Sequence, residues 1–199
     1  MAGPITRRAL LGRPGSRQPG GGDPPGDAEL LHALLAIELL AVAAYQRVAA
    51  APSLSPGNRT VVLQLHGQEQ QHAAALRQQL GSAATQSGPA TAAATNAALA
   101  KRNVAERIGR LQHEPDAIRL LIAVEGVAEG GYHDAISKLS DPRLLRLSAE
   151  IMANEAQHDT ILRELLHPGD AQRAVPVAFV EGTQGLMLAG SLGGDADRP

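Results

Sequence analysis

Apolar residues recur at every third or fourth position in four separate stretches of the chain. This spacing places them along one face of an α-helix. The second and fourth stretches each begin with a capping side chain followed by proline, Ser55-Pro56 and Asp141-Pro142, as helix starts often do. We therefore predict an all-α fold, an antiparallel four-helix bundle with a long crossover between the second and third helices. The predicted helices cover about residues 27–50, 56–80, 115–139 and 142–166.

The segments outside these helices lack such a period. Residues 1–26 are rich in Gly, Pro and Arg and are predicted to form a disordered arm. The connector at residues 81–114 is long enough to run the length of a bundle, and residues 96–113 could hold an additional amphipathic helix. Residues 170–199 are rich in Gly and are predicted to form an irregular tail. We thus predict one helical domain, residues 27–169, between an arm and a tail.

Polar residues interrupt the predicted apolar faces in a pattern that occurs twice. Each copy has a Glu inside one helix, a Tyr seven residues later, and a Glu-x-x-His sequence in the next helix. The step from the first to the second Glu is 31 residues in one copy and 30 in the other. Glu-x-x-His places a carboxylate and an imidazole one turn apart on the same helix face. The two copies are Glu38, Tyr45, Glu69 and His72, and Glu125, Tyr132, Glu155 and His158.

The spacing from the turns predicts that the two copies meet. Glu38 and Glu69 each lie about 13 residues, or roughly 20 Å, from the turn that joins their helices. Glu125 and Glu155 each lie about 14 residues from theirs. Short turns make the joined helices antiparallel neighbours, so the ligands of each pair should lie at the same depth.

Four Glu and two His on four helices form the ligand set of proteins that bind two metal ions between carboxylates. We predict Glu38, Glu69, His72, Glu125, Glu155 and His158 as ligands of two iron or manganese ions, which favour carboxylate and imidazole. Four carboxylates inside an apolar bundle would be costly without metal. The chain has no Cys, which excludes thiolate and iron–sulfur sites. The alternative is a bundle whose site is empty or decayed.

Four further residues lie close to these candidates on their helices. Tyr45 and Tyr132 could hydrogen-bond a ligand carboxylate, or they could be core aromatics whose hydroxyl finds any acceptor. His66 and Glu129 lie one turn from Glu69 and Glu125. They could be an extra ligand or a path for protons and ions, or they could be residues of a partly solvated rim.

Charge and the N-terminal residues bear on partners and location. A net charge of −2 gives no electrostatic case for binding nucleic acid. Arg7-Arg8 resembles the start of a twin-arginine export signal, but Gly12-Arg13-Pro14 follows where an apolar region is needed. We therefore expect a cytoplasmic protein, with export as the alternative. Residues 30–45 are apolar but contain His32 and Glu38, so no membrane span is expected.

The two Glu-x-x-His copies resemble the ferritin-like superfamily over about residues 27–166, and the Glu-x6-Tyr stretches resemble bacterial ferritin-like domain proteins of the di-iron carboxylate type. The resemblance implies a bundle with a di-iron or di-manganese site on the six predicted ligands. Members of the superfamily bind iron, oxidise Fe(II), or act on oxygen or peroxide. A ferroxidase or a di-metal oxidoreductase is therefore expected, and the alternatives are a non-catalytic metal-binding or stress-protective protein and a metal-free interaction module.

The C-terminal tail carries a second resemblance. Met187, Leu188 and Gly190-Ser191-Leu192 are similar to the targeting peptides of encapsulin cargo. This resemblance implies an encapsulin-like shell as a partner. The other partners expected are metal ions and, in a homo-oligomer, further copies of the chain.

Overall fold

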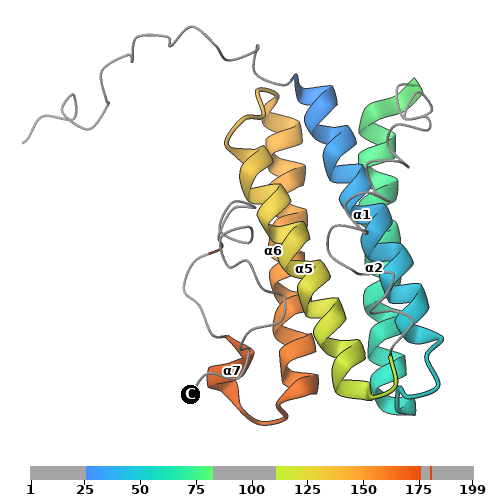
Figure 1. Ribbon diagram of the computed structural model, residues 1–199. Helices are drawn as coiled ribbons and strands as arrows, with labels where there is room; N and C mark the ends of the chain where they lie inside the picture. Colours follow the sequence, from blue (N-terminus) through green and yellow to red (C-terminus); the bar gives the residue numbers. More distant parts are fainter. Residues whose placement is uncertain (1–25, 83–110, 176–179, 181–199) are drawn as a thin grey trace, which may run out of the picture.

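The computed structural model describes residues 26–82, 111–175 and 180, and four long helices make up most of this described part. They form two antiparallel hairpins, α1 with α2 and α5 with α6, and α1 packs against α5 (Figure 1). The all-α fold and the four-helix bundle are thereby confirmed. The predicted arm, most of the connector and most of the tail lie outside the described residues. The helices are α1 Asp27–Ala49, α2 Pro56–Leu80, α5 Glu114–Ile136, α6 Pro142–Leu166 and the short α7 Ala171–Ala174.

The helix ends agree with the sequence except at two places. The third helix ends at Ile136 and not near Leu139, because the backbone N–H groups of Lys138 and Leu139 both bond to the carbonyl of Ala135 and turn the chain. Helix α7 was not predicted. Its first turn is capped by Asp170, whose side chain accepts from the backbone N–H of Arg173.

Each hairpin caps the turn of the other. At the start of α1, Asp27 accepts hydrogen bonds of 2.9 Å from the backbone N–H groups of Ser140 and Asp141, where α6 begins. At the start of α5, Glu114 accepts from the side-chain amide of Asn58 at 2.7 Å and from the backbone N–H of Ser55, where α2 begins. A carboxylate at a helix N-terminus satisfies free N–H groups and opposes the helix dipole. These contacts fix the register of the two hairpins.

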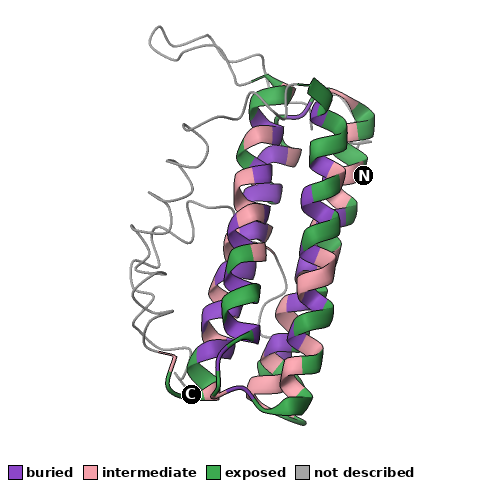
Figure 2. Ribbon diagram, turned by 90° about the vertical axis from the view of Figure 1, so that its right-hand side faces the viewer, coloured by how far each residue is buried: buried purple, intermediate pink, exposed green. Residues whose placement is uncertain are grey.

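The buried residues are distributed unequally over the four helices (Figure 2). Helices α1 and α5 bury 11 residues each, whereas α2 buries seven and α6 buries five. The reason is that α1 and α5 each pack against two neighbours, while α2 and α6 touch one another only weakly. The approach of α1 to α5 is close at Gly131, where an added Cβ would lie 2.5 Å from Cδ1 of Ile37.

Two apolar clusters lie one on each side of the level at which the Glu and His side chains meet. One contains Tyr45, Leu65 and Leu162, and the other contains Leu34, Leu76 and Tyr132. Side chains of this kind shield the space between them from water. Helix α1 is also, among the described residues, the one helix long and apolar enough to cross a membrane, but half of that stretch is buried inside the bundle.

Candidate metal centre

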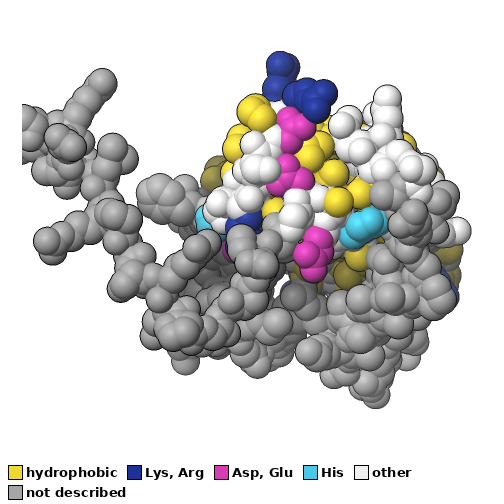
Figure 3. Space-filling view, turned by 90° about the horizontal axis from the view of Figure 1, so that it is seen from above, with side chains coloured by type: hydrophobic (Ala, Val, Ile, Leu, Met, Phe, Trp, Pro, Cys, Tyr) yellow, Lys and Arg dark blue, Asp and Glu magenta, His cyan; other side chains and the backbone are white. Residues whose placement is uncertain are grey.

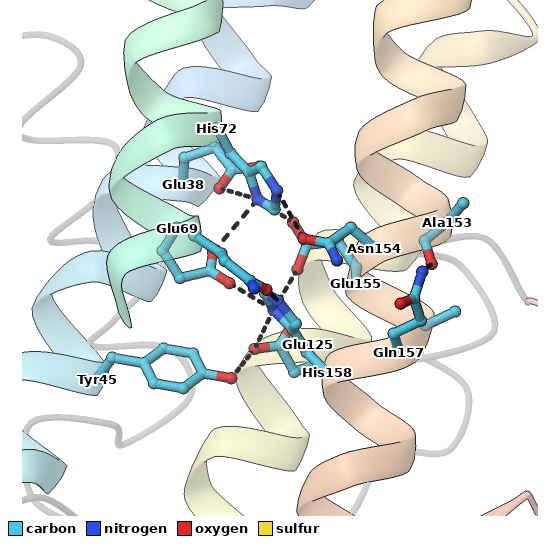
Figure 4. Close-up of polar contacts among 12 residues, drawn as sticks. Glu38, Tyr45, Glu69, His72, Glu125, Ala153, Asn154, Glu155, Gln157 and His158 are labelled. Carbon is cyan, nitrogen blue, oxygen red and sulfur yellow. Dashed lines mark hydrogen bonds and ion pairs between the residues drawn. The ribbon is translucent and has the colours of Figure 1, made fainter. Parts of the chain in front are cut away.

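All six predicted ligands converge in the middle of the bundle (Figure 4). Each helix contributes from its inner face: α1 Glu38, α2 Glu69 and His72, α5 Glu125, and α6 Glu155 and His158. The four Glu residues and His158 are buried, and His72, taken as a whole residue, is 9% exposed.

The six side chains form two overlapping groups, and in each group four ligand atoms lie within 4.8 Å of one another. Two residues, Glu69 and Glu155, belong to both groups. The remaining members divide by hairpin, with Glu38 and His72 in one group and Glu125 and His158 in the other. We call the first group position 1 and the second group position 2.

The shared carboxylates present one oxygen to each histidine. Nδ1 of His72 lies 2.8 Å from Oε1 of Glu155 and 3.9 Å from Oε2 of Glu69. Nδ1 of His158 lies 2.7 Å from Oε1 of Glu69 and 3.4 Å from Oε2 of Glu155. Both carboxylates therefore span the two positions, as bridging ligands would. The two imidazole rings face one another with centroids 5.9 Å apart.

The two tyrosines bond across the bundle. The hydroxyl of Tyr45 on α1 donates to Oε1 of Glu125 on α5, and the hydroxyl of Tyr132 on α5 donates to Oε1 of Glu38 on α1. Both tyrosines thus contact the carboxylate of a candidate ligand, as the first of the two predictions for them requires. Each bond occupies one oxygen of its Glu and leaves Oε2 free to face the cluster.

Two side-chain amides that the sequence analysis missed contact the far edges of the histidines. Nε2 of His158 lies 2.6 Å from Oε1 of Gln68, and Nε2 of His72 lies 3.0 Å from Oδ1 of Asn154. Both amides directly precede the shared Glu of their helix. An amide at the same place in both copies was the signal that could have revealed them.

Most of the unsatisfied polar atoms of the described chain lie in this cluster. Among the described residues, ten buried side-chain nitrogen and oxygen atoms have no hydrogen-bond partner. Eight of the ten belong to the six predicted ligands. Some of these atoms lie within ion-pair distance of each other, but they are not aligned for hydrogen bonds. They are oriented toward common centres, which fits a bound cation. The eight atoms are Oε2 of Glu38, both oxygens of Glu69 and of Glu155, Oε2 of Glu125, and Nδ1 of His72 and of His158.

The metal-free cluster holds extra protons. Burial raises the pKa of Glu38 to about 8, and it raises the pKa of Glu125 well above its ordinary value. Burial alone would lower the pKa of both histidines, but the neighbouring carboxylates outweigh it and raise the pKa of His72 to about 10 and of His158 to about 12. Burial opposes ionisation of Glu155 too, yet the close His158 and His72 rings stabilise its charged form and lower its pKa to about 2.

The other two residues near the predicted site do not join the cluster. His66 places Nε2 in a buried spot without a hydrogen-bond partner, but it contributes no atom to either group. Glu129 is partly buried, and its pKa is raised to about 7 by burial and by the charges of Asp159 and Glu155. Asp159 forms an ion pair of 2.6 Å with Arg163 on the same helix.

Comparison with known proteins agrees with this arrangement at the level of the family. No curated protein and no solved structure matches the chain. Residues 26–168 match the sequence profile of the ferritin-like domain, which covers the four long helices and the whole cluster. On this match and on its helical bundle, the chain belongs to the ferritin-like domain family.

Proposed function

We propose that the protein binds two iron or manganese ions in the buried cluster and uses the pair to oxidise Fe(II) or to react with oxygen or peroxide. The observation that carries the proposal is the set of eight unsatisfied ligand atoms in two overlapping groups. Four carboxylates match the charge of two divalent cations, so the loaded cluster would be neutral, as a buried site requires.

Each residue has a distinct part in such a site. Glu38 and His72 would hold one ion, Glu125 and His158 the other, and Glu69 and Glu155 would bridge them. Each position has four donors, which leaves room for water or an oxidant on an ion that accepts five or six ligands. Two Fe(II) ions supply two electrons, enough to reduce oxygen to peroxide or peroxide to water.

The residues around the cluster support this chemistry by restraining ligands and by excluding water. Tyr45 and Tyr132 restrain the outer carboxylates and leave one oxygen of each available. The two apolar clusters exclude water on both sides of the site. Exclusion of water strengthens the attraction between the carboxylates and the cations.

Metal analysis of the purified protein tests the binding step. Protein produced with iron or manganese supplied should hold about two metal ions per chain. His72→Ala and His158→Ala should each lower that content, whereas His133→Ala, an exposed histidine of α5, should leave it unchanged. A parent protein without metal would favour an interaction module, the alternative that needs no ion.

Activity assays distinguish an enzyme that oxidises Fe(II) from a non-catalytic, stress-protective metal-binding protein. Anaerobic Fe(II) is added to metal-free protein, oxygen or peroxide is admitted, and Fe(III) formation is followed by absorbance. Oxidation faster than in buffer, and abolished in Glu69→Ala, supports a ferroxidase-type enzyme. Full binding without faster oxidation supports the protective role.

The C-terminal tail supports a separate proposal about a partner. Gly190-Ser191-Leu192 and the apolar residues before it lie outside the described residues, so the proposal of an encapsulin-like shell rests on sequence alone. Short extended peptides bind through a few apolar anchors, and many copies in one assembly raise the apparent affinity. Co-expression with a shell protein should retain the full chain and lose a chain truncated after Gln184. Equal recovery of both would remove the tail from the proposal.

A further inference from the structure

The two amides beside the candidate ligands contact histidines of the opposite hairpin. Gln68 lies on α2, four residues from His72, yet its oxygen contacts His158 on α6 at 2.6 Å. Asn154 lies on α6, four residues from His158, yet its oxygen contacts His72 on α2 at 3.0 Å. Each amide therefore bridges the α2–α6 side of the bundle, where these helices otherwise touch little.

The contacts select one protonation form of each imidazole. Nδ1 of each histidine faces the carboxylates, so a metal ion can bind there only if Nδ1 has lost its proton. A neutral imidazole then carries its single proton on Nε2. An amide oxygen at Nε2 accepts that proton in a hydrogen bond and so fixes both the tautomer and the ring orientation. Being neutral, the amide does this without adding charge to the site.

The tyrosines follow the same crossed arrangement. Tyr132 of the second hairpin restrains Glu38, and Tyr45 of the first restrains Glu125. The two candidate ligands that belong to position 1 alone, Glu38 and His72, come from α1 and α2. The groups that orient them, Tyr132 and Asn154, come from α5 and α6 (Figure 4 shows Asn154 beside His72). The converse holds for position 2.

We infer that Gln68 and Asn154 are positioning residues, each holding the histidine of the metal position built by the other hairpin. This inference rests on the proposed metal binding and deepens it. It makes a directional claim, because a substitution on α2 should disturb a ligand on α6 and spare the histidine one turn away on its own helix.

The substitutions that test it remove the acceptor and keep the volume. Gln68→Met and Asn154→Leu are the test variants, and Gln71→Met, an exposed position of α2, is the matched control. Gln68→Glu restores an acceptor, and Gln68→Asn withdraws the oxygen by one methylene while keeping the residue polar, in case the apolar variant does not fold. Metal affinity is measured by titrating metal-free protein with Co(II) against a chelator, with Co(II) absorption as the signal.

A second readout observes the histidines themselves. Nitrogen-15 NMR of the Zn(II)-loaded protein assigns the metal-bound and protonated nitrogens of each imidazole. In the parent, both rings should carry their proton on Nε2, with slow exchange. Gln68→Met should weaken one of two binding steps by about 10- to 100-fold, and it should speed proton exchange at His158 alone. Asn154→Leu should do the same at His72 alone, and Gln68→Glu should recover the parent behaviour.

The possible results are distinguishable from failure of the proposed function. A parent that binds neither Co(II) nor Zn(II) would overturn the metal centre and this inference together. A parent that binds both ions, with Gln68 variants that match Gln71→Met, would overturn the inference alone. So would a Gln68 variant that disturbs His72 in place of His158, because that result would indicate a local effect on α2.

Discussion

The two hairpins supply matching ligands but place them in different surroundings. The His72 side chain of position 1 is 11% exposed, and the His158 side chain of position 2 is 1% exposed. The amide contact is also longer at His72, 3.0 Å against 2.6 Å at His158. A repeated ligand set thus gives two chemically similar positions, of which position 1 reaches solvent more readily and position 2 is enclosed.

The neighbours of the two positions break the repeat as well. His66 on α2 corresponds to Met152 on α6, and Glu129 on α5 corresponds to Val42 on α1. The polar residue of the first pair, His66, lies in the α1–α2 hairpin, and that of the second pair, Glu129, lies in the α5–α6 hairpin. Neither hairpin is therefore the more polar of the two. The difference between the positions therefore has to be measured position by position.

Loss of a shared ligand should have the largest effect. Glu155→Ala removes a carboxylate that serves both positions, so the metal content should fall from about two ions per chain to near zero. Glu150→Ala, an exposed carboxylate on the same helix, is the control. Metal analysis after gel filtration measures the content. Retention of one tightly bound ion in Glu155→Ala would show that this Glu is not shared.

Loss of a single histidine should separate the two positions. His158→Ala should retain an ion at position 1, and His72→Ala should retain one at position 2. Because His72 is the more exposed histidine, a chelator should remove the ion several times faster from His158→Ala than from His72→Ala. The measurement is stopped-flow chelation of Co(II)-loaded variants. Equal rates would contradict the difference drawn between the positions.

Metal uptake should release protons. At pH 7, pKa values of about 10 and about 12 leave His72 and His158 charged, and a pKa of about 8 leaves Glu38 mostly protonated. Burial also raises the pKa of Glu125 and so favours its protonated form. Each of these protons must leave before its group can act as a ligand, so loading both positions should release about three protons, and a fourth where Glu125 is protonated. Calorimetry in buffers of different ionisation enthalpy counts them. Release of none would mean that the cluster does not bind metal through these groups.

Stability of the metal-free protein should depend on pH in a defined direction. The raised pKa of Glu38 contributes stability that is fully present below about pH 4.5 and is lost as pH rises through about 8. The raised pKa of His72 contributes stability that is fully present below about pH 6.5 and is lost as pH rises through about 10. The lowered pKa of Glu155 contributes stability present above about pH 4.5 and lost toward pH 2. The melting temperature should therefore fall from about pH 5 to pH 9 without metal, and metal should restore it. Identical melting temperatures with and without metal at pH 8 would contradict a buried centre.

Much of the fold and the site was accessible from the sequence because both depend on helical spacing. The period of apolar residues gave the four helices, and counting residues from the turns placed Glu38 level with Glu69 and Glu125 level with Glu155. The crossing of Tyr45 to Glu125 was not accessible, since it depends on α1 lying beside α5. The contacts of Gln68 and Asn154 were not predicted, because a Gln or Asn side chain on a helix usually faces solvent. The early end of the third helix arises from local bonds to Ala135 that no spacing reveals.

The most direct test is a crystal structure of the Mn(II)-loaded protein with anomalous diffraction data. The central claim is that two ions occupy the cluster. It requires two anomalous peaks roughly 3.5–4 Å apart, one beside Glu38 and His72 and one beside Glu125 and His158, with Glu69 and Glu155 between them. A fully folded bundle without a peak among these six residues, or with peaks only at the surface, would contradict it.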